Sequence, residues 1–198
     1  RGKIIFDMDG VVTGEDCYWD AAALTVWELL YSGRYLGLAR RPELPEFKAG
    51  VSPREVAAIR RVIFQGDRVI TYFKQRAINS NWDLAALTFV YQLLSLCREF
   101  KNRERENAAF LFAELFAGKV SFAGCLQGLS RLLKSGVGAW APDFGAVLHA
   151  GAGGARGEEL LVHFFARLSG ERGKPAGRAL IASSALWAGV RDVFQEWY

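Results

Sequence analysis

The sequence predicts a predominantly helical chain attached to one strand of an α/β domain, and three observations lead to this fold class. A short β-branched and aromatic run, Lys3 to Asp7, ends in a loop that holds two acids and a glycine. Nearly all later apolar residues recur at the spacing of one helical face. No second convincing strand follows in the sequence. We therefore expect a buried strand first and helices after it.

The helix starts are marked by capping residues. Ser52 precedes Pro53 at the first helical position, and Glu55 closes a capping box. Asn81 and Ser121 stand where two further caps belong. Six groups of apolar residues recur at helical spacing, and each group predicts one helix. The groups are Trp19, Ala23, Val26, Trp27 and Leu30; Leu84, Leu87, Val90, Tyr91, Leu94 and Cys97; Phe110, Ala113 and Ala117; Phe122, Cys125, Leu126, Leu129 and Leu133; Leu160, Leu161, Phe164 and Leu168; Leu186, Val190, Val193, Phe194 and Trp197.

The single strand creates a contradiction, because a buried strand needs neighbours on both sides to satisfy its backbone. Ala179 to Ala182 could form one more strand, but Ser183 or Ser184 then stands where the cap of the last helix belongs, and we favour the cap. We expect the rest of the sheet to lie outside these residues. The predicted organisation is residues 1–14 as first strand and loop, and residues 15–198 as a helical domain.

Composition narrows the function class. The chain has 198 residues, and 25 basic against 21 acidic side chains give a net charge of +4, which is spread along the sequence without the stripe of a nucleic-acid binder. The three cysteines form no CxxC pair, which fits a reducing compartment. The longest uncharged apolar stretch, Leu84 to Cys97, is 14 residues and too short to span a bilayer. We expect a soluble, cytoplasmic protein that binds neither nucleic acid nor membrane.

The loop after the strand carries the chemistry. Asp7 and Asp9 are two residues apart, and Gly10 permits a tight turn. Such a loop, with Met8 between the acids, can present backbone N–H groups to a phosphate. The first carboxylate can attack phosphorus and the second can act as acid and base. Mg²⁺, which prefers hard oxygen ligands, would offset the repulsion between carboxylate and phosphate.

Two neutral interpretations compete with a catalytic loop. The two acids could simply end a strand at a turn, or they could start a calcium loop. A calcium loop needs further oxygen donors at alternate positions, where Val11 and Thr13 supply at most one. The catalytic interpretation is therefore favoured.

The segment Phe6 to Thr13, FDMDGVVT, resembles the first motif of the haloacid-dehalogenase superfamily. The resemblance implies that Asp7 is the nucleophile and Asp9 the general acid/base, and that the Asp7 carboxylate and the Asp9 main-chain carbonyl bind Mg²⁺. It also implies a Rossmann-like α/β core, incomplete in these residues, with a large helical cap inserted after the motif.

The same resemblance makes Gly14 to Asp16 a short flap, in which Glu15 and Asp16 could contact substrate. The competing interpretation is that both acids merely favour the positive end of a helix dipole. Gly66-Asp67 superficially resembles the acidic fourth motif of the family, but it comes too early and has Thr71 where a second acid is needed, so we reject it.

The predicted function is Mg²⁺-dependent phosphatase activity on a small phosphorylated metabolite through an aspartyl phosphate. The alternatives are a phosphomutase of the same superfamily and a non-enzymatic helical interaction module. Because no convincing second, third or fourth motif of the family is found, we expect this chain alone to be weakly active or inactive. The sequence leaves the substrate and the oligomeric state open.

Overall fold

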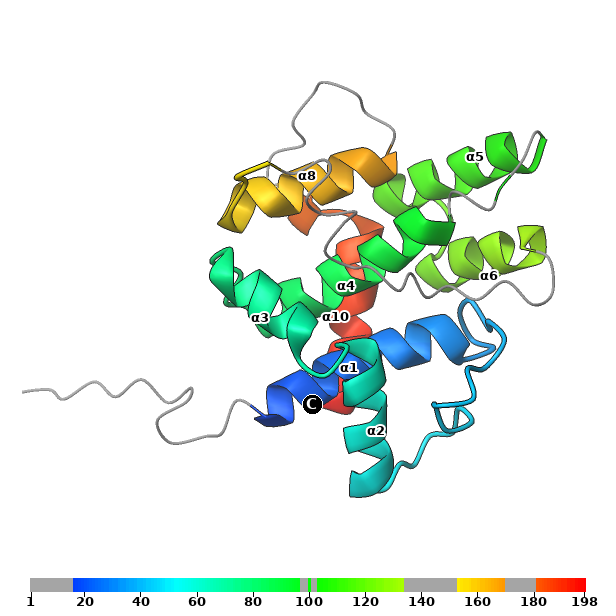
Figure 1. Ribbon diagram of the computed structural model, residues 1–198. Helices are drawn as coiled ribbons and strands as arrows, with labels where there is room; N and C mark the ends of the chain where they lie inside the picture. Colours follow the sequence, from blue (N-terminus) through cyan, green and yellow to red (C-terminus); the bar gives the residue numbers. More distant parts are fainter. Residues whose placement is uncertain (1–15, 97–99, 101–102, 134–152, 170–180) are drawn as a thin grey trace, which may run out of the picture.

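The computed structural model describes residues 16–96, 100, 103–133, 153–169 and 181–198, and within these ranges the regular elements are eight α-helices (Figure 1). The helical prediction is confirmed there, whereas the predicted strand Lys3–Asp7 lies outside the described residues. The helices are α1 Asp16–Tyr31, α2 Pro53–Ile63, α3 Arg68–Gln75, α4 Asn81–Leu96, α5 Arg103–Ala117, α6 Phe122–Leu132, α8 Gly157–Ser169 and α10 Ala185–Trp197.

Three helices form the centre of the body. α1, α4 and α10 pack against one another in pairs, α2 packs against α1, and α8 packs against α4. α5 and α6 form an antiparallel pair that packs against α10 on the other side (Figure 1). Large side chains such as Trp27, Phe89 and Tyr91 are fully buried between these helices. The long apolar stretch that begins at Leu84 therefore forms a core helix.

Three serines cap the N-termini of α2, α6 and α10, as the sequence predicts. The Ser52 hydroxyl accepts the N–H of Glu55, and the Glu55 carboxylate in turn accepts the backbone N–H of Ser52 at 2.8 Å. Ser121 accepts from the N–H of Gly124 at 3.1 Å, and Ser184 accepts from the N–H of Trp187 at 3.1 Å. These bonds satisfy N–H groups that have no partner within the helix.

Two expectations near the caps are corrected. Asn81 is the first residue of α4 and not its cap, because the hydroxyl of Ser80 accepts the N–H of Asp83 at 3.3 Å. Ile181 and Ala182 are helical, so the alternative strand at 179–182 is wrong for its described residues. The cap interpretation of Ser184 explains this outcome, since the chain there turns from one helical segment into α10.

The helix predicted from Phe110, Ala113 and Ala117 is confirmed as α5, but these three residues do not form its buried face. Phe110 is 61% exposed, and Ala113 and Ala117 are also exposed, whereas Phe112 and Leu115 are buried. α5 carries apolar residues around most of its circumference, so spacing alone does not choose a face. The neighbouring helices α6, α8 and α10 make that choice.

Helix α3 was not predicted. It follows a turn in which Gln65, Gly66 and Asp67 all have positive φ, at 51°, 63° and 67°. Only glycine adopts this region without a steric cost, so the turn stores strain at two of its residues.

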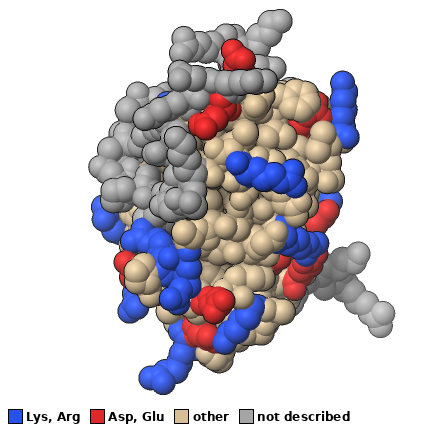
Figure 2. Space-filling view, turned by 90° about the vertical axis from the view of Figure 1, so that its right-hand side faces the viewer, with Lys and Arg blue, Asp and Glu red and all other residues tan. Residues whose placement is uncertain are grey.

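No helix among the described residues has both the length and the apolar character that crossing a membrane requires. On the face shown in Figure 2, basic side chains have acidic neighbours instead of forming one continuous stripe.

Candidate functional site at the start of α1

Of the predicted site residues, only Asp16 is among the residues that the structure describes. Asp7, Met8, Asp9, Gly10 and Glu15 lie outside the described residues. Asp16 is the first residue of α1, and its side chain is 77% exposed. The candidate functional site that can be described is therefore the surface around Asp16.

Asp16 belongs to a charged cluster centred on Arg60. The Nη1 atom of Arg60 lies 2.9 Å from the Oδ1 atom of Asp16 and 3.4 Å from the Oδ1 atom of Asp20. Its Nε and Nη2 atoms donate to the two carboxylate oxygens of Asp67 at 3.2 and 3.3 Å. One guanidinium thus joins α1, the last turn of α2 and the turn before α3. We call Asp16, Trp19, Asp20, Arg60 and Asp67 the Arg60 cluster.

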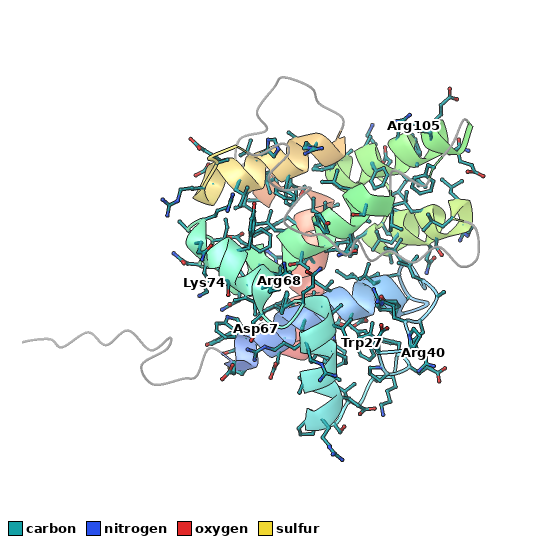
Figure 3. All side chains as sticks on the ribbon, viewed as in Figure 1. Trp27, Arg40, Asp67, Arg68, Lys74 and Arg105 are labelled. Carbon is teal, nitrogen blue, oxygen red and sulfur yellow. The ribbon has the colours of Figure 1, made fainter. Side chains whose placement is uncertain are left out.

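Local geometry explains why these residues meet. Asp16 and Asp20 are four residues apart, so they share one face of α1. Asp67 stands at the cap position of α3 but makes no side-chain cap hydrogen bond, because its left-handed backbone turns the carboxylate toward Arg60. Figure 3 shows Asp67 at the turn between α2 and α3, close to the start of α1.

An aromatic ring supports the cluster from one side. The guanidinium carbon of Arg60 lies 4.8 Å from the centre of the Trp19 ring, and the ammonium group of Lys74 lies 5.9 Å from it. Cations are attracted to the face of an indole ring, most strongly where water is excluded. The Arg60 side chain is only 16% exposed, so the ring and the carboxylates replace most of its water.

The cluster keeps Arg60 charged. Burial lowers the pKa of Arg60. The hydrogen bonds with Asp16 and Asp67 and the charges of Asp67 and Asp20 together raise this pKa by more than burial lowers it, so the net shift is upward. Three carboxylates face one guanidinium, which leaves the exposed carboxylate of Asp16 at the edge of the cluster. This arrangement is suited to anchoring the start of α1.

The described residues contain no group of three His, Cys, Asp or Glu side chains that could hold a metal ion. A shallow open hollow of about 310 Å³ lies beside the cluster, lined by Gly66, Arg68, Thr71, Tyr72 and Gln75. Asp67, which belongs to the rejected Gly66-Asp67 motif, forms an ion pair with Arg60 in this structure.

The sequence interpretation missed Arg60. The four-residue spacing of Asp16 and Asp20 was visible, but the basic partner comes from 44 and 40 positions away. Helical spacing gives no information on which distant helix supplies such a partner.

The described residues define an all-helical domain with an ion cluster where its first helix begins. No family model and no curated protein matches the chain. A solved structure that does match is the X-ray structure of Northeast Structural Genomics Consortium target ZR25, with a TM-score of 0.73 and 25% sequence identity. The match covers 98% of this chain and 47% of that chain, so the chain spans about half the length of that protein.

Proposed function

We propose that this chain is the nucleophile loop and helical cap of a Mg²⁺-dependent phosphatase that acts on a small phosphorylated metabolite. The observation that carries the proposal is the position of Asp16. It opens the helical body only six residues after Gly10, and the Arg60 cluster anchors it there. A helical body that starts directly behind the DMDG loop is the arrangement that the sequence resemblance implies.

In the proposed reaction, a carboxylate oxygen of Asp7 attacks phosphorus, and the bond between phosphorus and the leaving oxygen breaks. Asp9 donates its proton to that oxygen, which leaves as an alcohol. The ionised Asp9 then takes a proton from a water molecule, whose oxygen attacks the aspartyl phosphate. Inorganic phosphate leaves, and both aspartates return to their first state.

The donor set of the loop suits Mg²⁺. The Asp7 carboxylate and the Asp9 main-chain carbonyl are hard oxygen ligands, which Mg²⁺ prefers. When bound, the ion would supply charge that offsets the repulsion between the nucleophile and the phosphate. The helical body would close over the loop, exclude water and select the leaving group.

The test is Mg²⁺-dependent release of phosphate from p-nitrophenyl phosphate by the full-length polypeptide that contains these residues. Asp7→Asn should reduce the rate to background, and Asp9→Asn should also lose activity because the leaving oxygen is no longer protonated. Asp192→Asn is the matched control, since Asp192 is 65% exposed and pairs with its neighbour Arg191. Activity that survives Asp7→Asn would overturn the proposal, because Asp7 could not then be the nucleophile.

A further inference from the structure

Aromatic side chains gather at the end of the body where α1 begins. The rings of Tyr18 and Tyr198 stack at 5.0 Å with an interplanar angle of 16°, and their hydroxyls are 3.1 Å apart. Phe194 links this pair to Trp82, because its ring centre lies 6.3 Å from those of both Tyr198 and Trp82. We call Tyr18, Trp82, Phe194 and Tyr198 the aromatic end.

These aromatic residues extend the buried apolar faces of their helices toward the surface. Tyr18, Trp82 and Tyr198 each stand three or four residues from a buried residue on the same helical face. The buried neighbours are Ala22 on α1, Ala86 on α4 and Phe194 on α10. The buried faces of α1, α4 and α10 therefore continue into the aromatic end, where their rings contact one another.

Two of the four residues of the aromatic end are exposed among the described residues. Trp82 is 41% exposed and Tyr198 is 64% exposed. Trp and Tyr are enriched at the centre of protein interfaces, so exposed rings of this kind suit a docking surface.

We propose that the aromatic end is the surface on which the α/β part of the same polypeptide docks. This inference rests on the proposed function, which makes residues 1–14 the first strand and loop of that part. Residues 1–14 join the body at Asp16, two residues before Tyr18, so the part they belong to is tethered beside the aromatic end. One strand cannot form a sheet by itself, so this part must include further strands.

The length of the similar solved protein supports the same occupant. This chain matches 47% of that protein, which leaves about half of it for structure other than the helical body. A second copy of this chain is the competing occupant, but it would have no tether at Asp16.

Hydroxyl-radical footprinting of the full-length polypeptide tests the proposal, because it reports the solvent access of individual side chains. Phe110 is the internal reference, since it is 61% exposed on α5 and belongs to no described aromatic pair. After correction for intrinsic reactivity, Trp82 and Tyr198 should be oxidised several-fold more slowly than Phe110. Rates that match that of Phe110, or a reading frame that stops at Tyr198, would overturn the proposal.

Two further outcomes separate the alternatives. Protection of Trp82 and Tyr198 that disappears on dilution would indicate a second copy and would also overturn the proposed occupant. A different result would contradict the proposed function alone. If the full-length protein has no phosphatase activity but Trp82 and Tyr198 stay protected, the enzymatic proposal is refuted and the docking surface is retained. The Asp7→Asn variant should keep the protection, because Asp7 acts in chemistry and not in docking.

Discussion

The indole N–H of Trp197 donates a hydrogen bond of 2.8 Å to the carboxylate of Glu28, which comes from a helix 169 positions earlier in the chain. The Glu28 side chain is only 8% exposed, and the guanidinium of Arg34 lies 3.8 Å from its second oxygen. Arg34 also pairs with Glu196 at 2.9 Å. These contacts fix the end of α10 against α1 at the buried edge of the core.

Glu28 makes stability depend on pH. Burial raises the pKa of Glu28, the hydrogen bond from Trp197 lowers it, the charge of Glu196 raises it and that of Arg34 lowers it, with a net upward shift. The folded state therefore binds this proton more tightly than the unfolded state, and stability contributed by Glu28 is lost as pH rises from 4.5 through the raised pKa. We expect Glu28→Gln to gain stability relative to the wild type over that range.

Urea unfolding at several pH values measures this difference. Trp197→Phe is the companion variant, because it keeps an aromatic ring but removes the donor. It should cost roughly 1–3 kcal/mol above the raised pKa, where Glu28 is ionised, and less below it. A Glu28→Gln difference that does not vary with pH would contradict the assignment.

Arg60→Met should destabilise the body by roughly 1–2 kcal/mol, because Asp16, Asp20 and Asp67 lose their shared cation while two of the three remain largely hydrated. The effect should include faster hydrogen exchange in the first turns of α1, which Arg60 anchors. Thermal unfolding and exchange measured by mass spectrometry report the two changes.

Arg61→Met is the matched control for Arg60, since Arg61 is the exposed neighbour on the same helix. A surface substitution of this kind should change stability by no more than about 0.5 kcal/mol. Equal effects of the two variants would show that the Arg60 cluster does not hold α1.

Gly189→Ala should destabilise the packing of α10 against α6. A Cβ atom at Gly189 would lie 2.3 Å from the ring of Phe122, which is rigid and cannot move aside cheaply. Overpacking of this kind costs about 1–3 kcal/mol, and the gain in helix propensity returns less than about 1 kcal/mol. Chemical denaturation measures the loss, and Phe122→Leu in the same chain should restore part of it.

Gly128→Ala separates helix propensity from overpacking. Its added Cβ would meet the flexible end of Leu111 at 2.9 Å, so a small rotation can relieve the contact. We expect a change near zero for Gly128→Ala. A loss as large as that of Gly189→Ala would contradict the explanation from ring rigidity.

Glu55 supplies a second, opposite dependence on pH. The hydrogen bond with Lys48, the backbone N–H of Ser52 and the Ser52 hydroxyl lower the pKa of Glu55 to about 2. Stability from this group is present above 4.5 and is lost as pH falls from 4.5 to about 2. Glu55→Gln should show a shallower acid loss than the wild type in urea unfolding. An identical acid slope would refute the role of this capping box in pH-dependent stability.

Several elements could be predicted because their signals are local. The Ser52 capping box and the Ser121 and Ser184 caps are bonds across three residues, so adjacent sequence specifies them. Helix α3 was missed because it is only eight residues long and follows a turn of three left-handed residues that propensities do not favour. The predicted catalytic acids Asp7 and Asp9 lie outside the described residues and stay a prediction.

The sequence by itself determined that the body is helical and where several of its helices begin. Only the tertiary structure decided that Phe112 and not Phe110 faces the core, and that Arg60 joins Asp16 to Asp67. The physical reason is range. A cap is satisfied within one helical turn, whereas a buried face or an ion cluster depends on which distant helix supplies the partner.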